Sequence, residues 1–361
     1  MIVVLLVAAR ADARAAARAA LESASDIAVC GESGSARDIE RLLQKFRPEV
    51  IILGSSLGKA VLLEVTERIM QETPTAVVVL EDAGPEVSDQ AGFEALQRGA
   101  VEIARSPAGV DRARAKRLSA ELVDTVRMAS RVRLIRRRPV VTPAAKGAGR
   151  ASAVRALVAI GASTGGPPAL VQILSALPAA FSAPILVVQH MTDGFSEQFV
   201  SWLSSMVPQR VMIPKSGEVP EPGVVYVGQE GQHLGVNANG TLRVSDDPPL
   251  NGHRPAATVL FESLAGSSIS NRVGVILTGM GDDGARGLVA LRRSGGYVLA
   301  QDAASCVVFG MPQAAIALGA ANEVAALDDI GPRLLVLMLD DTARQDDQSP
   351  GPARRRKRVE S

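Results

Sequence analysis

Short, uninterrupted apolar runs alternate with amphipathic stretches along the chain, and this alternation restricts the fold more than any other feature. In the first 130 residues the runs lie at 2–7, 27–30, 50–53, 76–80 and 101–103, with amphipathic stretches such as 36–46 and 59–71 between them. Continuous apolar runs of this length are typical of parallel strands covered by helices on both faces. We therefore expect an α/β domain over residues 1–130: a doubly wound parallel sheet of five β-α units that ends in a helix at about 111–130.

A second α/β pattern follows, with apolar runs at 156–160, 185–189, 273–278 and 297–300. These runs predict a second doubly wound parallel sheet over residues 154–340. Its glycine- and proline-rich middle, 217–249, contains short runs at 224–227 and 242–245 that predict a small region of antiparallel strands. Residues 131–153, rich in arginine and then in proline, glycine and alanine, predict a linker, and the polar, basic stretch 341–361 predicts a disordered tail.

Composition removes several classes of function. Lys and Arg (39) balance Asp and Glu (38) and only 3% of residues are aromatic, so neither a strong field nor stacking rings favour a nucleic-acid partner. No apolar run approaches the 18 residues of a membrane span, and the charges that follow the apolar start favour a buried strand over a signal peptide. Cys30 and Cys306 stand far apart, which argues against a disulfide framework or a cysteine zinc site and favours a reducing, cytoplasmic setting.

A serine between two glycines follows the run at 156–160. Gly161, Ser163 and Gly165 form a G-x-S-x-G spacing between a predicted strand and a predicted helix. This arrangement places a serine hydroxyl on a sharp turn, and the amino end of the helix favours a developing oxyanion. The alternative is a dinucleotide or phosphate loop, but the spacing is not G-x-G-x-x-G and no P-loop lysine follows. Ser163 is therefore a candidate nucleophile.

A serine nucleophile needs a base, usually histidine, and the chain has three histidines. His190 ends the run at 185–189, and the carboxyl end of a parallel strand is where α/β folds place functional groups. His233 lies in a turn and is expected in a surface loop. His253 precedes a predicted helix, and it either caps that helix or lines the site together with Arg254.

The base in turn needs an orienting carboxylate. Asp282 and Asp283 follow the run at 273–278 in a glycine-rich turn, although either could instead be a plain helix cap. The serine, histidine and aspartate candidates then all follow predicted parallel strands of one domain. This shared location predicts a Ser-His-Asp site.

Five segments in order, 159–166, 189–191, 253–255, 277–284 and 304–312, closely resemble the catalytic domain of CheB, the chemotaxis protein-glutamate methylesterases. The resemblance covers roughly residues 154–339. It implies hydrolysis of glutamyl methyl esters on chemoreceptors with release of methanol, deamidation of some receptor glutamines, and no metal or organic cofactor. It also implies methylated chemoreceptors as partners.

The resemblance assigns roles to individual residues. It implies that Ser163 is the nucleophile, that His190 is the base, and that Asp283 rather than Asp282 is the acid. It further implies that the Thr164 hydroxyl and the backbone around Met280 lie at the site.

CheB proteins carry an N-terminal receiver domain, and residues 1–110 fit its (βα)5 pattern, which implies an intramolecular partner for the catalytic domain. The receiver's chemistry is missing at the expected positions. Ala8 and Ala9 replace the acidic pair that holds Mg²⁺, Gly54 replaces the phospho-acceptor aspartate, and Ser106 replaces the lysine. We expect a pseudo-receiver that is not phosphorylated by the family mechanism. Either its docking is weak and the esterase is always active, or another input moves it.

Two alternative functions stay open at this level. The catalytic domain could be retained as a non-catalytic docking or scaffold module of a chemosensory array, although the intact set of Ser163, His190 and Asp283 argues against this. The enzyme could also be an amidohydrolase for a protein side chain such as receptor glutamine. Esters and amides share the same oxyanion requirement, so the residues do not separate these two reactions.

Overall fold

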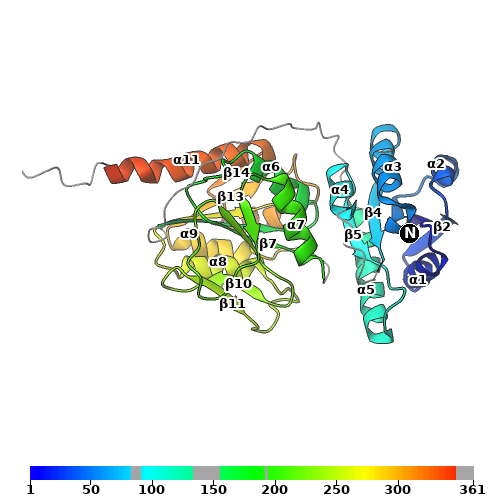
Figure 1. Ribbon diagram of the computed structural model, residues 1–361, viewed down its shortest axis with the longest axis horizontal. Coiled ribbons are helices and arrows are strands. Elements are labelled where there is room, and N and C mark those ends of the chain that lie inside the picture. The colour runs from blue at the N-terminus through cyan, green and yellow to red at the C-terminus, as the bar shows by residue number, and fades with distance from the viewer. Residues whose placement is uncertain (83–90, 133–154, 192–193, 347–361) are drawn as a thin grey trace, which may run out of the picture.

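The computed structural model describes residues 1–82, 91–132, 155–191 and 194–346. Two separate parallel sheets account for the two α/β patterns, and they lie side by side along the long axis of the molecule, with the N-terminal half on the right in Figure 1. Most of the predicted linker (133–153) and most of the predicted tail (347–361) lie outside the described residues.

The N-terminal half is a five-stranded parallel sheet in the order β2-β1-β3-β4-β5, a common order of doubly wound folds. Its strands are β1 (Ile2–Val7), β2 (Ile27–Ser33), β3 (Val50–Gly54), β4 (Ala76–Glu81) and β5 (Glu102–Arg105). Its helices are α1 (Ala11–Glu22), α2 (Ile39–Phe46), α3 (Lys59–Glu72), α4 (Ala91–Gln97) and α5 (Arg112–Ala129), with short 3-10 turns at Ala36–Asp38 and Ser55–Leu57. Helices α1 and α5 cover one face of the sheet and α2, α3 and α4 the other, so the predicted doubly wound fold is confirmed.

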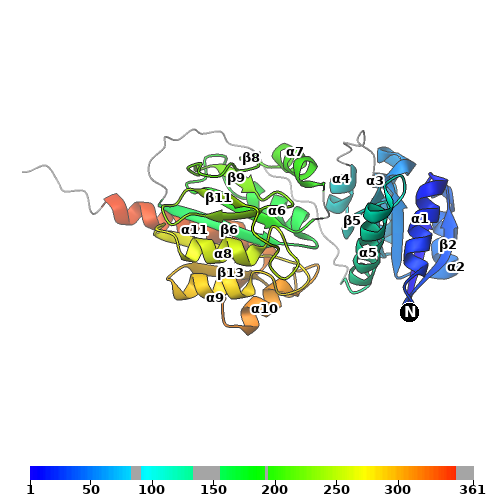
Figure 2. The same cartoon turned by 90° about the horizontal axis from the view of Figure 1, so that it is seen from below.

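The C-terminal half is a seven-stranded parallel sheet in the order β14-β13-β12-β6-β7-β9-β8. Figure 2 shows this half with β6, β8, β9 and β13 labelled. Its strands are β6 (Ala156–Ala162), β7 (Ile185–Gln189), β8 (Arg210–Met212), β9 (Val224–Val227), β12 (Asn271–Ile276), β13 (Tyr297–Gln301) and β14 (Glu323–Ala325). Its helices are α6 (Gly166–Ser175), α7 (Ser196–Met206), α8 (Ala257–Ala265), α9 (Ala285–Arg293), α10 (Met311–Ala317) and α11 (Leu327–Asp346). A separate antiparallel pair joins β10 (His233–Val236) to β11 (Leu242–Ser245).

Two sequence-based expectations need correction in this half. The run at 224–227 was expected in the antiparallel region, but β9 pairs in parallel with both β7 and β8. All four of its residues are buried, as in a strand covered on both faces. The disordered tail was expected from residue 341, but helix α11 continues to Asp346. The next residue that breaks a helix is Pro350, so nothing in the sequence ends the helix at 340.

The strand order places a crevice where the functional residues are expected. β6 is the first strand of the C-terminal half, with β7 on one side and β12 on the other. The chain passes from β6 to β7 in one direction along the sheet and from β12 to β13 in the other. Such a switch point opens a crevice at the carboxyl ends of the strands. The predicted nucleophile, base and acid follow β6, β7 and β12.

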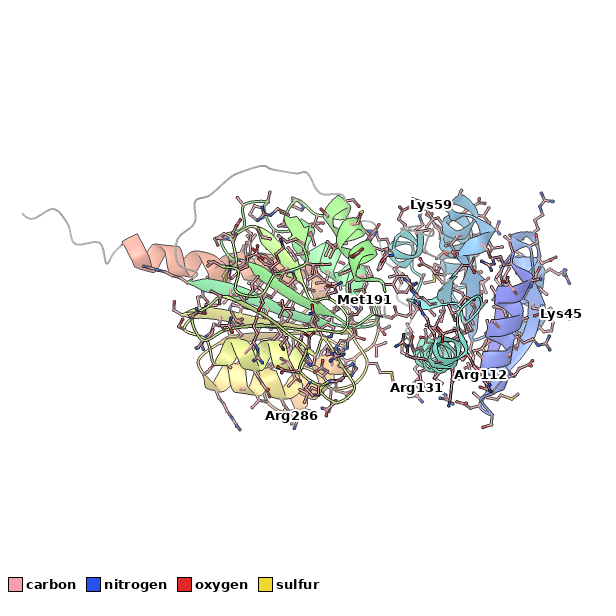
Figure 3. The ribbon with its side chains drawn as sticks, turned by 60° about the horizontal axis from the view of Figure 1, so that its bottom comes forward. Lys45, Lys59, Arg112, Arg131, Met191 and Arg286 are labelled. Carbon is pink, nitrogen blue, oxygen red and sulfur yellow. The ribbon has the colours of Figure 1, made fainter. Side chains whose placement is uncertain are left out.

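An aromatic cluster joins the two halves. Phe93 of α4 lies 5.2 Å from the Trp202 ring in a stacked arrangement, and 6.2 Å and 5.6 Å from the rings of Phe195 and Phe199. All four rings are at most 3% exposed. Met191, which packs against the same core, lies on the side of the C-terminal half that faces α4 and α5 (Figure 3). The two halves therefore share one continuous core at this contact.

Candidate active site

Strand register brings the candidate nucleophile and base together. β6 and β7 pair with Ala162 opposite Gln189, so Ser163 and His190 are the next residues of adjacent strands. The His190 backbone N–H donates to the Ala162 carbonyl at 2.9 Å. The buried Gln189 side chain donates through Nε2 to the carbonyl oxygens of both Ser163 and His190, each at 2.8 Å. One amide group thus fixes the backbone of both residues.

Sequence reasoning gave Gln189 no role. The available signal is that a polar residue closes an otherwise apolar, buried run. The N–H groups of a buried amide usually find carbonyl partners, so such a residue indicates a backbone clamp at a strand end.

The candidate acid is held at the other side of His190. The His190 Nε2 lies 2.9 Å from Asp283 Oδ2, which also accepts from the Ala257 N–H at 2.6 Å. Oδ1 accepts from the backbone N–H groups of Thr258 and Gly284 at 3.0 and 2.9 Å. Burial acts to raise the pKa of Asp283, but the hydrogen bonds from His190 and Thr258 outweigh it and hold that pKa well below its usual range. Asp283 is therefore ionised at neutral pH, oriented by the first turn of α8.

The residues alone left two aspartates open as the acid. Asp282 is exposed, whereas Asp283 is 7% exposed and bonded to His190. The geometry agrees with the choice of Asp283 that the family resemblance implied.

His253 joins the site and Arg254 supports a nearby loop. The His253 ring lies face to face with the His190 ring, with centroids 4.2 Å apart and an interplanar angle of 1°. The Arg254 guanidinium donates to the carbonyl oxygens of Asp246 and Asp247 at 3.2 and 3.3 Å, and so braces the segment between β11 and α8.

The floor of the site is built from small residues and a buried threonine. A Cβ on Gly279 would lie 2.7 Å from the Ser163 Cβ, so only glycine fits beside the candidate nucleophile. Thr278 Oγ1 donates to the Thr164 carbonyl at 2.9 Å and accepts from the Val308 N–H at 2.9 Å. These bonds tie the turn after β6 to the loop that follows β13. Thr164 is 3% exposed.

The remaining sequence candidates are placed differently. Met280 is 48% exposed and projects to solvent at the edge of the site. His233 was expected in a surface loop, but it is 2% exposed. Its Nε2 lies 3.1 Å from the Pro248 carbonyl and its Nδ1 accepts from the Ala256 N–H at 3.2 Å. The turn before His233 continues into strand β10, which packs against α8, so this histidine supports the fold.

The N-terminal half reaches this site directly. The Thr164 hydroxyl hydrogen-bonds the side chain of Glu102, the first residue of β5. Burial raises the pKa of Glu102 to about 7, while the hydrogen bonds that its carboxylate accepts act in the opposite direction. Arg105 donates to the Gly194 carbonyl at 2.6 Å, and its guanidinium carbon lies 4.4 Å from the centre of the Phe195 ring. A carboxyl group of one half therefore sits beside the residue that follows Ser163.

The strand ends of the N-terminal sheet carry no carboxylate at the positions where a receiver would hold Mg²⁺. Ala8 follows β1, Gly54 ends β3, and a Cβ on Gly54 would lie 2.4 Å from that of Ala8. The Arg14 guanidinium donates to the Ala8 and Ala9 carbonyl oxygens at 2.5 and 2.9 Å. Mg²⁺ requires carboxylate oxygens, so these residues do not fit a receiver metal site. Within the described ranges, no group of three histidine, cysteine or acidic residues is placed to hold a metal ion.

Comparison with known proteins decides the family. The profile described as CheB methylesterase matches residues 158–334. A protein-glutamate methylesterase/protein-glutamine glutaminase of Anaeromyxobacter dehalogenans is 40% identical over 338 residues, which cover 92% of this chain and 98% of the relative. The chain belongs to the CheB methylesterase family. The predicted resemblance is thereby confirmed.

A further relative agrees with this membership. A Myxococcus xanthus protein-glutamate methylesterase/protein-glutamine glutaminase is 38% identical, over 85% of this chain and 89% of the relative. The crystal structure of the CheB methylesterase catalytic domain of Thermotoga maritima is similar to half of this CheB-family chain, with 39% identity, a TM-score of 0.49 and 98% of that domain covered. Among the helices of the described ranges, none combines the length and apolar character needed to cross a bilayer.

Proposed function

We propose that this protein hydrolyses methyl esters of glutamate side chains on chemoreceptor-like proteins and releases methanol. The observation that carries the proposal is the bond between His190 and the ionised Asp283, at the strand edge where Ser163 follows the adjacent strand. A serine, a histidine and a buried carboxylate in this relation form the machinery of acyl transfer. The names of the relatives support the same substrate and reaction.

We infer the path of each proton from the bond between His190 and Asp283. His190 uses Nε2 for Asp283, so Nδ1 takes the proton of the Ser163 hydroxyl as its oxygen attacks the ester carbonyl. Asp283 stabilises the resulting imidazolium, and backbone N–H groups would stabilise the developing oxyanion, as acyl transfer requires. The tetrahedral intermediate expels methoxide, which receives the proton from His190 and leaves as methanol. Water then attacks the acyl-enzyme by the same route and regenerates Ser163.

Deamidation of glutamine is a second candidate reaction. It follows the same steps, with ammonia in place of methanol as the leaving group. The relatives' names include a protein-glutamine glutaminase activity, which favours it for this chain. Measuring ammonia against methanol release separates the two.

We propose further that the N-terminal half controls access to the site without phosphoryl chemistry. Glu102 contacts Thr164 directly beside Ser163, and Val307 and Val308, from the loop that binds Thr278, pack against the N-terminal core. A receptor helix needs this same face. Gly54 carries no group that could accept a phosphoryl group, so in this proposal either docking is weak and the esterase is always active, or another input moves the N-terminal half. Cys30 and Cys306 form no disulfide, which suits a reducing cytoplasm.

The test of the activity is methanol release from a methylated receptor signalling fragment, with the full chain and Ser163→Ala measured in parallel. Loss of a triad serine costs at least about 10⁴-fold in kcat, so the variant should release no methanol above background. Equal rates for the two proteins would refute Ser163 as nucleophile. No release by the wild type, even with the docking contact weakened, would favour the alternative of a non-catalytic docking module.

A further inference from the structure

The segment between β11 and α8 carries His253, which contacts His190, and leads into the helix whose first N–H groups bind Asp283. Leu250 and His253 exchange two backbone hydrogen bonds of 3.0 Å, closed by a turn in which Asn251 and Gly252 adopt left-handed φ values of 51° and 86°. Four residues after His253 the segment enters α8, whose first N–H groups hold Asp283. The backbone of His253 is therefore fixed relative to the carboxylate that orients His190.

The contact between the two histidine rings is flat and close. A centroid separation of 4.2 Å with an interplanar angle of 1° places the ring faces in van der Waals contact. Parallel rings at this separation fit the stacked contacts that aromatic rings make, and the two hydrogen bonds between Leu250 and His253 hold the backbone that positions the second ring. The single bond from Nε2 to Asp283 leaves the His190 ring free to pivot about that bond, and the face of His253 blocks the pivot.

The charge of His253 suits this role. Burial lowers the pKa of His253, and the neighbouring His190 acts in the same direction, while Asp283 and Asp282 act in the opposite direction. His253 is thus neutral at pH 7. It offers a ring face, rather than a second positive charge, when His190 takes the serine proton.

We propose that His253 is a positioning residue for the reaction: its ring holds the His190 imidazole in the plane in which one nitrogen meets Asp283 and the other meets Ser163. This inference rests on the proposed function. His253 exchanges no proton and touches no substrate atom. What matters is a flat ring at this place, so phenylalanine can replace it and alanine cannot.

The experiment compares wild type, His253→Ala and His253→Phe as full chains, with kcat and KM for methanol release from a methylated receptor fragment. We expect His253→Ala to lower kcat about tenfold with KM within twofold, because a misdirected base lowers the rate without weakening binding. His253→Phe should retain at least about a third of the wild-type kcat. Wild-type kcat in His253→Ala, equal losses in both variants, or a change confined to KM would each overturn the proposal.

Two further measurements separate this proposal from the proposed function. The rate at which phenylmethylsulfonyl fluoride inactivates each protein reports activation of Ser163 without any receptor, so the comparison stands even if no methanol is released. The proton resonance of the His190–Asp283 bond should be sharp in wild type and His253→Phe, and broadened by exchange in His253→Ala. An unchanged resonance and inactivation rate in His253→Ala would refute positioning, whatever the substrate.

Discussion

Replacing Phe93 by alanine should activate the enzyme by loosening the contact between its two halves. Phe93 belongs to the N-terminal half, yet its ring packs among Phe195, Phe199 and Trp202 of the C-terminal half and is 2% exposed. In an open arrangement this ring would lie at the surface of α4. Its removal therefore weakens docking more than it weakens the fold of the N-terminal half.

The size of the effect follows from the burial of the ring. Truncating a buried phenylalanine to alanine costs about 3–5 kcal/mol. Part of this cost arises from packing of Phe93 on its own half, which leaves about 2 kcal/mol for the docking equilibrium. At 1.4 kcal/mol for each factor of ten, the ratio of open to docked protein rises about 30-fold. The rate rises by the same factor until the protein is fully open.

The assay is methanol release from a methylated receptor fragment under conditions where kcat/KM is measured. Glu94→Ala is the matched control, because this side chain lies on the same helix but pairs with Lys59 of its own half at 2.7 Å. A partly exposed ion pair contributes at most about 1 kcal/mol, so the control should keep the wild-type rate. A folded Phe93→Ala protein with the wild-type rate would refute the idea that docking limits access.

Two other predictions concern the N-terminal half. Burial raises the pKa of Glu102 to about 7 from an ordinary 4.5. The docked state therefore binds a proton more readily than the open state, so docking is strongest below pH 4.5 and weakens as pH rises toward 7. The amide of Glu102→Gln stays neutral and keeps docking tight at every pH, whereas the wild type opens as pH rises. The ratio of the Glu102→Gln rate to the wild-type rate should therefore fall about tenfold from pH 5 to pH 7.5, since water screens part of the effect. A constant ratio would contradict this linkage. Acetyl phosphate with Mg²⁺ should leave the rate of methanol release and the mass of the protein unchanged, since Gly54 has no acceptor oxygen. A phosphorylated species in mass spectrometry would show that another residue accepts the phosphoryl group.

The strand ends that carry Ser163 and His190 were predictable because both follow continuous apolar runs, and the carboxyl ends of adjacent parallel strands lie at one edge. The choice between Asp282 and Asp283 was not available from spacing. It depends on which side chain the turn after β12 directs toward the first N–H groups of α8. The error over 224–227 has a similar cause, because its neighbouring turns suggested a hairpin while its complete burial belongs to a parallel strand.

Contacts between segments far apart in sequence were beyond pattern reasoning. His253 faces His190 only because a short left-handed turn at Asn251 and Gly252 returns the chain toward β7. Glu102 meets Thr164 only because two separate sheets dock, and neither residue belongs to a periodic pattern that faces the other. Periodicity reports which side of an element is buried, but it carries no information about which distant surface covers it.

The guanidinium of Arg14 places a fixed positive charge at the strand ends of the N-terminal half. It is covalently attached to the chain and bonded to the Ala8 and Ala9 carbonyl oxygens. Its local concentration therefore does not depend on the surrounding medium, and no chelator can remove it. A receiver that depends on a diffusible cation reports the ionic and phosphorylation state of the cell. In this half the positive charge is part of the chain, so these strand ends carry the same charge whatever the concentration of Mg²⁺.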